Sequence, residues 1–503
     1  MTDRDHASHA GRGLLSIAGA KIFFVVAGFA VQFLLPRFLG SAERYGLLMA
    51  AMSGVSILNN VMVTGTVQTV SKFVSEAEDR SAATIRRALG LQVGLGLALG
   101  GGLALSAGSL ASAMRDPELA GLLRISSLVV VAYSLYATLI GALNGLHRFQ
   151  QQARFDVSFT AMRTLGLLVG PALGLGVASA MAGFATAAWA ITFAAFVAVG
   201  AGASGETVSL RRWLAFMAPI WIYQTFLNGI LQLDVWILKG TVAGLEVAAG
   251  ATREAAAALS NQYVGYYRAA QTFAFVPYQL ILSMTFIVFP MVSRATALGD
   301  DALAQATVRQ AMRFSLLALL AFAAPMAGAS DGVLRIAYAP DYLAGAGALQ
   351  ILVLGLVAFA LFVIAATILG GAGQPTVAAV VAGIALVVVL GGNYGVLHAV
   401  GVGGRTLVGA ASATSAGMAI ALVLSGFALY RRFGTFLPAA SVARGLVAGL
   451  VAAIVAHFVP HGSRLLALVA LAAGFFAFLA TLVITGEVEP EERAKLVRIV
   501  KRT

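Results

Sequence analysis

Residues 346–370 read AGALQILVLGLVAFALFVIAATILG, which is 25 residues without an acidic or basic side chain. After the break Gly373-Gln374-Pro375, residues 375–399 read PTVAAVVAGIALVVVLGGNYGVLHA, again without Asp, Glu, Lys or Arg. A helix needs about 20 consecutive apolar residues to cross the hydrocarbon core of a bilayer. These two stretches therefore predict two transmembrane helices joined by a tight turn.

The same pattern extends over the whole chain of 503 residues, which is 60% hydrophobic and only 11% charged. A typical soluble domain is about 25% charged, so a soluble fold is excluded. We predict an all-α integral membrane protein of about fourteen transmembrane helices. The predicted segments are 14–36, 46–71, 88–112, 121–146, 157–180, 183–203, 214–238, 263–291, 313–337, 346–370, 375–399, 406–429, 439–459 and 464–485.

Charge and cysteine content exclude several other classes. There is no cysteine, so disulfides and thiolate metal sites are ruled out. The net charge of +12 does not indicate nucleic-acid binding, because the charges lie in short loops between apolar segments. The first apolar run is longer than a signal peptide and lacks a small-residue cleavage site, so we interpret it as a membrane helix.

Lysine and arginine orient the predicted helices. With a cytoplasmic N-terminus, the inside loops and tails hold 21 Lys and Arg, the outside loops hold nine, and three lie within helices. Cytoplasmic loops are enriched in positive charge. Both termini are therefore predicted to be cytoplasmic, which requires an even number of helices.

An internal repeat suggests two similar lobes. At an offset of 222 residues, Tyr45 matches Tyr267 and Arg87 matches Arg309. We predict an N-lobe of helices 1–6 (1–210), a C-lobe of helices 7–12 (211–432) in pseudo-twofold repeat, and two further helices with a tail (433–503). Parallel repeats are a transporter architecture. A 22-residue insertion at about 240–261 has no assigned role, and its Ala-rich part 245–259 fits a short amphipathic helix on the outer surface.

Glycines in the third predicted helix suggest close helix packing. Small residues let helix backbones approach one another in lipid. Gly96, Gly100 and Gly101 fit such contacts, and the alternative is apolar packing without a chosen partner.

Polar side chains within the predicted spans gather on helices 1, 2, 7 and 8. These occupy equivalent positions in the two repeats, and the stripes follow i, i+3 and i+4 spacing on one helix face. We expect a water-accessible cavity between the two lobes, because polar residues within a membrane mark pathways. The residues expected to line it are Gln32, Asn60, Thr64, Gln68, Gln224, Asn228, Gln232, Gln271 and Gln279.

Three charged residues stand out in this expected cavity. Lys21 and Arg268 are basic and Asp234 is acidic, so the cavity would be net basic and would suit an anionic substrate such as a pyrophosphate. Alternatives stay open: Lys21 and Arg268 could extend to the membrane interfaces, Asp234 could form a structural ion pair, and the amides could hydrogen-bond between helices. Arg163, two turns into its predicted helix, fits an interfacial position better than a functional one.

No enzyme motif survives inspection. There is no Walker A sequence. Gly328-Ala329-Ser330-Asp331-Gly332 matches G-x-S-x-G but lies at the end of a membrane helix, not between a strand and a helix. The loops are too short for a catalytic site, so we predict that the protein is not an enzyme. It needs no cofactor in this interpretation, except a coupling ion such as Na⁺ or H⁺.

Several stretches resemble a known family. These are the segment from Gly19-Ala20-Lys21 to Glu43-Arg44-Tyr45-Gly46, the segment from Tyr266-Tyr267-Arg268 to Val292-Ser293-Arg294, and the link from Leu334 to Leu352. Their order and spacing resemble the prokaryotic polysaccharide-biosynthesis exporters, or Wzx-type oligosaccharide flippases, of the multidrug/oligosaccharidyl-lipid/polysaccharide transporter superfamily.

The resemblance implies a function. It implies that a lipid-linked glycan, carried on polyprenyl pyrophosphate, crosses the bilayer by alternating access. Lys21 and Arg268 would attract its anionic groups, and Asp234 would serve ion coupling or gating. Partners would include a polysaccharide polymerase and assembly proteins. The alternatives are a cation-coupled multidrug antiporter of the same superfamily, which would need more cavity carboxylates, and a membrane enzyme or scaffold of glycan assembly.

Overall fold

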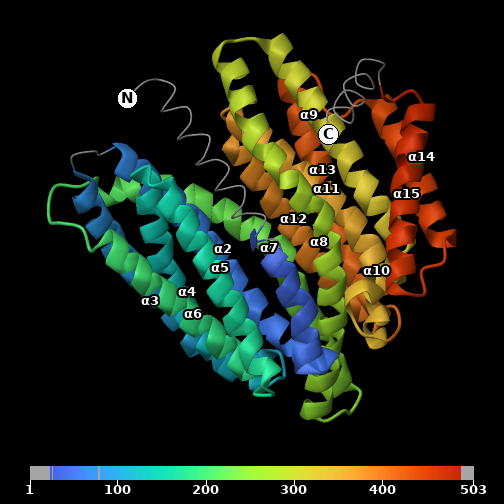
Figure 1. The fold of residues 1–503 in the computed structure, drawn as a ribbon, viewed down its shortest axis with the longest axis horizontal. Helices are drawn as coiled ribbons and strands as arrows, with labels where there is room; N and C mark the ends of the chain where they lie inside the picture. The colour runs from blue at the N-terminus through green and yellow to red at the C-terminus, as the bar shows by residue number, and fades with distance from the viewer. Residues whose placement is uncertain (1–22, 25, 77–79, 489–503) are drawn as a thin grey trace. The chain divides into compact units, whose positions relative to one another are not determined.

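The computed structural model describes residues 23–24, 26–76 and 80–488, and all regular secondary structure in this part of the chain is helical, without strands. Figure 1 shows the helices as a set of long rods joined by short turns. A helical stretch Val26–Leu39 comes first. It is followed by α2 (Ala42–Glu76), α3 (Ser81–Ala113), α4 (Glu118–Gly145), α5 (Phe149–Ala172), α6 (Gly176–Val199), α7 (Leu210–Ala248), α8 (Arg253–Ala297), α9 (Asp301–Gly328), α10 (Ser330–Ala337), η2 (Pro340–Gly345), α11 (Ala346–Gly371), α12 (Pro375–Val400), α13 (Thr406–Phe433), α14 (Ala439–Phe458) and α15 (Arg464–Ile484).

The predicted all-α membrane fold is confirmed. Among the described residues, eleven helices are long and apolar enough to cross a membrane: α2, α3, α4, α6, α7, α9, the continuous Pro340–Gly371, and α12 to α15. Each of the fourteen predicted segments overlaps a helix, and the remaining three overlap Val26–Leu39, α5 and α8. The chain is a multi-pass membrane protein.

The predicted boundary between helices 5 and 6 was wrong by seven to eight residues. Helix α5 spans Phe149–Ala172, not 157–180, and α6 begins at Gly176, not 183. The turn between them contains Gly174 and Gly176, whose φ angles are 76° and 77°. Such positive φ angles favour glycine. This turn lies in a continuous apolar run, so no polar residue marked it in the sequence.

The predicted amphipathic helix at 245–259 is also not formed. Helix α7 continues to Ala248, and α8 begins at Arg253. Gly250, with φ of 97°, makes the turn between them. The extra residues therefore lengthen α7 and α8 into a helical hairpin. Similarly, the predicted span 313–337 is divided into α9 and the short α10, which begins at Ser330.

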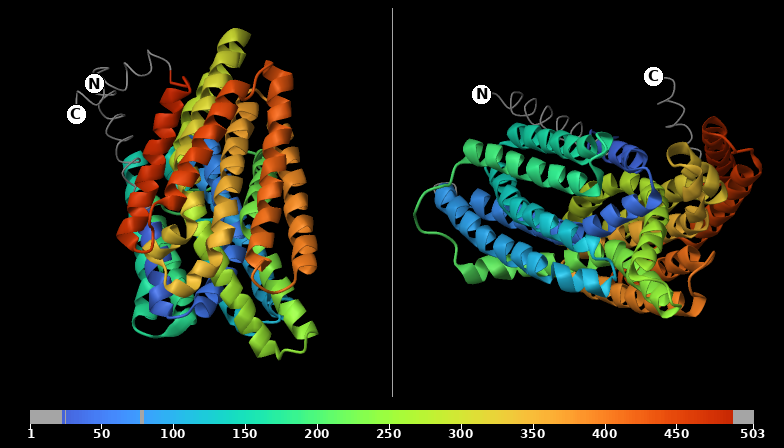
Figure 2. Two further views of the ribbon diagram at one scale, coloured as in Figure 1. Left: turned by 90° about the vertical axis from the view of Figure 1, so that its right-hand side faces the viewer. Right: turned by 90° about the horizontal axis from the view of Figure 1, so that it is seen from below.

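The chain forms two compact units, residues 1–265 and 266–503. In the first unit α4 packs against α2, α3 and α6, while α5 packs against α6 and α7 against α2. In the second unit α13 packs against α11 and α12, and α9 packs against α11, α14 and α15. Figure 2 shows the pairing of α14 and α15 from two further directions. The predicted lobes 1–210 and 211–432 stay a prediction.

An aromatic core holds one end of the first unit together. The rings of Phe73 in α2 and Trp213 in α7 lie 4.9 Å apart, and both side chains are buried. Tyr136 of α4 and Ile85 of α3 belong to the same buried cluster. Four helices thus meet in one apolar core, whose burial stabilises the unit by packing.

Two of the three predicted contact glycines are real contacts of α3 with α4. A Cβ atom added at Gly100 would lie 2.7 Å from Val131 Cγ2 and 2.9 Å from the backbone oxygen of Ser127. One added at Gly96 would lie 2.2 Å from Ser134 Oγ. At Gly101 an added Cβ would meet no atom within 4 Å, so that part of the interpretation was wrong.

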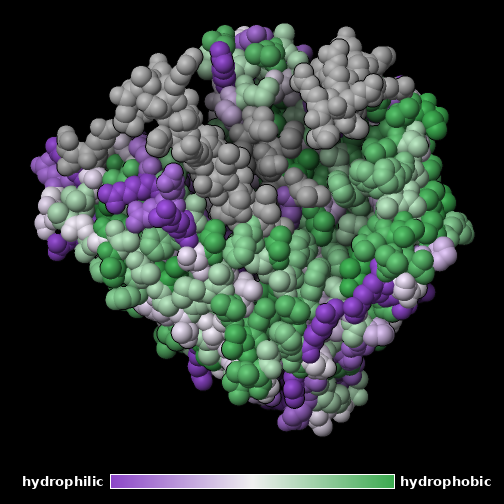
Figure 3. Space-filling model, viewed as in Figure 1, coloured by the Kyte–Doolittle hydropathy of each residue, from purple (hydrophilic) through white to green (hydrophobic). Residues whose placement is uncertain are grey.

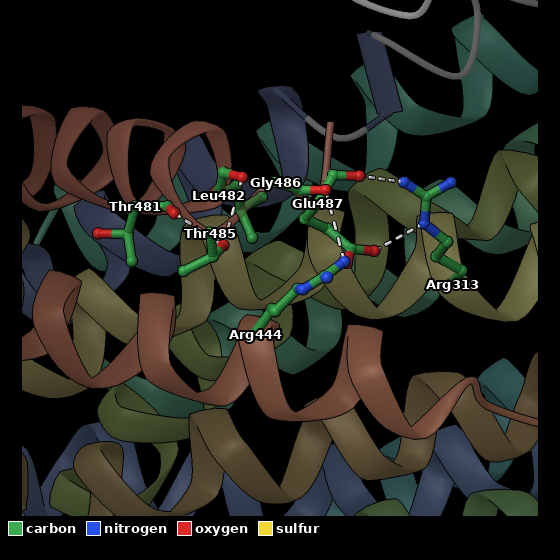
Figure 4. Close-up of polar contacts among 7 residues, drawn as sticks. All are labelled: Arg313, Arg444, Thr481, Leu482, Thr485, Gly486 and Glu487. Atoms are coloured by element: carbon green, nitrogen blue, oxygen red, sulfur yellow. Dashed lines mark hydrogen bonds and ion pairs between the residues drawn. The ribbon is translucent and has the colours of Figure 1, made fainter. Parts of the chain in front are cut away.

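A buried glutamate joins three helices of the second unit (Figure 4). Glu487 follows α15 and is 2% exposed. Its Oε1 accepts from Arg313 Nε of α9 at 2.7 Å, and its Oε2 accepts from Arg444 Nη1 of α14 at 3.1 Å. Its backbone oxygen accepts from Arg313 Nη2 at 2.5 Å. The end of α15 is thereby bound to both α9 and α14.

These contacts set the ionisation of Glu487. Burial raises the pKa of its carboxyl, but hydrogen bonds from Ser441, Arg313 and Arg444 outweigh burial and hold the pKa below its ordinary value of 4.5.

The outward surface suits a lipid environment. In Figure 3 hydrophobic residues cover most of the face in view, and hydrophilic residues gather in a few places. Large apolar side chains such as Leu105, Phe193 and Ile484 are 88%, 69% and 83% exposed. Such exposure is normal where lipid is the solvent.

We predict opposite effects for two neighbouring glycine substitutions. Gly101→Ala should raise the free energy of unfolding by up to about 1 kcal/mol, because alanine is the better helix former. Gly100→Ala should lower it by about 1–2 kcal/mol, because overpacking outweighs this gain. Thermal unfolding of the detergent-solubilised protein measures both. Equal shifts for the two variants would contradict the described α3–α4 contact.

We predict an acid-dependent contribution from Glu487. Because its pKa is lowered in the folded protein, its contribution is fully present above the ordinary pKa and is lost as the pH falls through the lowered value. Glu487→Gln should cost about 1.5–3 kcal/mol at pH 7 and progressively less at acid pH. Melting temperatures between pH 7 and pH 3 test this, with the 85%-exposed Glu206→Gln as a control that should change little. A pH-independent difference would refute it.

Candidate functional site

Helices α2 and α7 of the first unit pack closely along their length. A Cβ atom added at Gly54 would lie 2.6 Å from the ring of Trp236, and one added at Gly65 would lie 2.1 Å from the ring of Trp221. Trp236 Nε1 also donates to the backbone oxygen of Ala50 at 3.0 Å. Each glycine therefore makes room for a tryptophan of the facing helix. We call this contact the α2–α7 seam.

The predicted polar stripes of these two helices meet between the two tryptophans. Asn60 Nδ2 donates to Asn228 Oδ1 at 2.7 Å, and Asn228 Nδ2 donates to the backbone oxygen of Gln224 at 2.8 Å. Asn228 is buried, while Gln224 and Gln232 are half-buried. The Asn60–Asn228 pair is an interhelical hydrogen bond, which is the alternative that the sequence left open for the amides.

The rest of the α2 stripe is more accessible. Asn60 and Gln68 are exposed and Thr64 is half-buried. An exposed polar row on a membrane helix is compatible with a water-filled path. The role of these residues as a cavity lining stays a prediction.

A small pocket lies within the first unit beside Gln32. Gln32 Oε1 accepts from the hydroxyl of Tyr45 at 2.5 Å, which joins the helical stretch Val26–Leu39 to α2. The pocket has a volume of about 60 Å³. Its lining comes from that stretch, α2 and α5, and consists of Phe24, Gly28, Val31, Gln32, Met49, Met52, Thr160, Arg163 and Thr164.

Two of the three predicted charged residues, Asp234 and Arg268, lie in the described part of the chain. Asp234 is fully buried in α7, and its Oδ1 accepts from the backbone N–H of Val235 at 2.8 Å. Lys21 lies outside the described residues. Arg268 lies in the second unit, half-buried, where its Nη1 donates to Gln271 Oε1 at 2.8 Å. The roles of all three stay predictions.

Two glutamines accompany Arg268 on α8. Gln271 is 4% exposed, while Gln279, two turns further along the helix, is exposed. The hydroxyl of Thr272 donates to the backbone oxygen of Arg268 at 2.9 Å. Arg268 is thus positioned by its own helix, with Gln271 as a local hydrogen-bond partner.

Sequence reasoning missed a buried ion pair in the first unit. Lys239 Nζ of α7 lies 2.7 Å from Asp116 Oδ2, in the turn before α4, and their side chains are 1% and 3% exposed. Asn261 of α8 hydrogen-bonds both: its Oδ1 accepts from Lys239, and its Nδ2 donates to Asp116 Oδ2 at 2.9 Å. Buried charges persist when they are paired and hydrogen-bonded. We call these residues the Lys239 cluster.

The sequence alone did not reveal this cluster, because of where its residues lie in the chain. Asp116 lies in the polar run Arg115-Asp116-Pro117-Glu118, which marked a loop, and Lys239 lay just beyond the predicted end of its helix. The continuation of α7 to Ala248 places Lys239 inside a helix instead. Only knowledge of the long α7 could have indicated that this lysine needs a buried partner.

The α2–α7 seam, the pocket beside Gln32 and the Lys239 cluster are built from hydrogen bonds and ion pairs. Their described residues form no recognisable catalytic constellation. Among the described residues, no group of three or more His, Asp or Glu side chains could hold a metal ion. The side chains that cluster are mostly amides and hydroxyls, which suit recognition of polar groups, and the buried cation Lys239 is paired with Asp116.

The sequence matches one family model. Residues 10–296 match the model of the family described as "Polysaccharide biosynthesis protein". A comparison with curated proteins found no match.

The fold is similar to solved transporter structures. The lipid II flippase MurJ in an inward closed conformation has a TM-score of 0.76 at 15% identity, covering 94% of this chain and 98% of that one. An inward-facing multidrug resistance transporter of the MATE family has a TM-score of 0.64 at 16% identity, covering 82% and 94%. A transporter of the same MOP superfamily from Pyrococcus furiosus, described as having a binding pocket of reversed polarity, has a TM-score of 0.57 at 14% identity, covering 84% and 95%.

We predict that the Lys239 cluster is required for stability as a unit. Lys239→Met should cost about 3–5 kcal/mol, because it leaves the Asp116 carboxylate buried without a cation. The double variant Asp116→Asn with Lys239→Met should recover most of that loss, since no charge remains. Unfolding of the purified variants in a double-mutant cycle measures the coupling. Arg80→Met, which breaks an exposed pair with Glu206, is the control and should cost less than about 1 kcal/mol. Additive single effects would contradict the prediction.

Proposed function

The chain belongs to the polysaccharide biosynthesis protein family, within the superfamily that includes multidrug and oligosaccharide transporters, and we propose that it moves a lipid-linked oligosaccharide across the bacterial cytoplasmic membrane. The substrate in this proposal is a glycan attached to polyprenyl pyrophosphate. It is moved from the cytoplasmic to the outer leaflet for cell-surface polysaccharide synthesis.

The observation that carries the proposal is the family match over residues 10–296. The likeness to a lipid II flippase supports a transporter fold suited to a lipid-linked cargo. The family and the fold are those of transporters, which agrees with the prediction that the protein is not an enzyme. Transport needs a path for polar groups through the bilayer, and the exposed Asn60 and Gln68 on α2 supply polar surface for one.

We assign roles to the charged residues as part of this proposal. Arg268 and Lys21 attract the pyrophosphate or acidic sugars of the cargo, since Arg and Lys are the usual binders of such groups. Asp234 couples transport to Na⁺ or H⁺ or acts in gating. Gln224, Gln232, Gln271 and Gln279 offer hydrogen bonds to sugar hydroxyls. A polymerase and other assembly proteins receive the product, and both termini are cytoplasmic.

The runner-up is a cation-coupled drug antiporter, since the solved neighbours include multidrug transporters. The α2–α7 seam argues against it. Its paired polar side chains are the amides Asn60 and Asn228, not carboxylates. A cationic drug would be better served by acidic groups. The export assay below distinguishes the two.

We predict that a strain lacking this protein accumulates lipid-linked repeat units inside the cell and loses surface polysaccharide. The wild-type gene should restore export. Arg268→Ala should reduce export about tenfold or more, because a hydrogen bond to a charged group contributes about 1.5–3 kcal/mol. Lys21→Ala should act similarly.

The control is Arg405→Ala, which removes an exposed arginine at the start of α13 in the same unit as Arg268. It should export normally. Mass spectrometry of lipid-linked intermediates and surface glycan staining supply the readouts. Normal surface glycans in the deletion strain, together with greater sensitivity to cationic drugs, would reject the flippase and favour the antiporter.

A further inference from the structure

Arg163 lies much deeper in its helix than the sequence suggested. The predicted span 157–180 placed it two turns from the end, at an interface. Helix α5 begins at Phe149, so Arg163 follows 14 residues of helix and lies about 21 Å along its axis. Nine further residues, 164–172, follow it to the other end of the helix. The strongly polar residues of α5, from Gln150 to Asp156, lie in its first two turns, and Arg163 lies in the more apolar remainder of the helix. A cation in an apolar segment of a membrane protein is costly and marks a functional site by default.

The surroundings hold Arg163 without neutralising it. Its guanidinium lies over the ring of Phe184 of α6, 5.2 Å from the ring centroid. Its Nε is buried and has no hydrogen-bond partner in the described part of the chain. Within residues 23–24, 26–76 and 80–488, no carboxylate forms an ion pair with it.

The nearest acid on the same face of α5 is occupied elsewhere. Asp156 lies seven residues before Arg163, which is two helical turns. Its Oδ1 accepts from the hydroxyl of Tyr136 of α4 at 3.4 Å. Asp156 is therefore a partner of α4, and the charge of Arg163 remains available.

Arg163 lines the pocket beside Gln32, and the other polar groups there include hydrogen-bond donors. Gln32 uses its amide oxygen for Tyr45, which leaves its amide NH₂ to donate. Thr164 contributes a hydroxyl, while the hydroxyl of Thr160 already donates to the backbone oxygen of Asp156. No Asp or Glu of the described residues is among those that line it. A cation, an amide NH₂ and a hydroxyl together form a donor set for an oxyanion.

The size of the pocket limits what it holds. About 60 Å³ has room for a few water molecules or one small oxyanion, so only the charged group of a larger molecule would enter it. The apolar residues Val31, Met49 and Met52 complete the lining. Low polarity around the donors strengthens their attraction for a charged group.

We propose that Arg163, with Gln32 and Thr164, forms a binding site for an oxyanion of the transported glycolipid within the first unit. The group is a phosphate of the lipid carrier or the carboxylate of an acidic sugar, which share this chemistry. The site deepens the proposed function and rests on it for the identity of the cargo. Phe184 holds the guanidinium in place by its cation–π contact.

The test uses the full-length protein in nanodiscs of phosphatidylcholine, which carries no net charge. Pyrophosphate and glucuronate are the two probes, and their binding is measured by thermal shift and by titration calorimetry. Pyrophosphate binding that weakens at high salt is expected if a phosphate is the ligand, whereas glucuronate binding indicates an acidic sugar. Arg163→Gln should weaken binding of the preferred probe about tenfold or more, and Arg163→Lys should retain part of it.

The matched control is Arg154→Gln, which removes an exposed arginine of the same helix, nine residues earlier. It should bind the probe like the wild type. Wild-type affinity in Arg163→Gln, or no binding of either probe to the wild-type protein, would overturn the proposal. If Arg163→Gln does not fold, hydrogen exchange of the wild-type protein decides. The probe should protect α5, and an unchanged exchange pattern in α5 would refute the site.

Failure of this site and failure of the proposed function are separable. If Arg163→Gln restores surface glycan fully in the deletion strain and binds the probe normally, the site is wrong while the flippase assignment stands. If the wild-type protein binds an oxyanion through Arg163, but deleting the protein leaves glycan export intact, the proposed cargo is wrong. The anion-binding site itself then remains.

Discussion

The hydrocarbon interior of a membrane offers no hydrogen bonds, and the rest of this structure follows from that constraint. Every backbone N–H and C=O within the bilayer must be satisfied by the chain itself, which selects helices. With lipid outside, there is also no hydrophobic drive between helices, so packing depends on shape. Gly54, Gly65 and Gly100 have no side chain, so a ring or backbone of the neighbouring helix can pack directly against them. Polar side chains then find partners in pairs, as Asn60 with Asn228 and Lys239 with Asp116 do.

The fold could largely be predicted from the sequence, because apolar runs of about 20 residues without charges indicate transmembrane helices. At Gly373-Gln374-Pro375, where polar residues and a proline separate two charge-free runs, the predicted and observed helices agree closely. Where only glycine ends a helix inside an apolar run, as at Gly174, composition has no signal. The position of Arg163 was misjudged at the other end of the same helix, where Gln150-Gln151-Gln152 indicated a loop and α5 instead begins at Phe149, eight residues before the predicted start.

The candidate site was less predictable, because it depends on contacts between distant segments. The polar stripes of α2 and α7 were visible as spacing, but their hydrogen bond to each other was only one of two open interpretations. The Lys239 cluster joins residues from three parts of the chain, and each of them reads as a loop or helix end when taken singly. The spacing of polar residues along one helix can be seen in a sequence. Which polar residues of different helices pair with each other is known only from the fold.

The Lys239 cluster also has a consequence for how the protein is made. Asp116 and Lys239 are 123 residues apart. At ribosomal rates of about 5–20 residues per second, Asp116 emerges some 6–25 s before its partner. During that interval the hairpin of α3 and α4 must keep its end near water or near a membrane insertion factor. The first unit can therefore close only after α7 has been synthesised, and the order of synthesis makes this ion pair a late step in assembly.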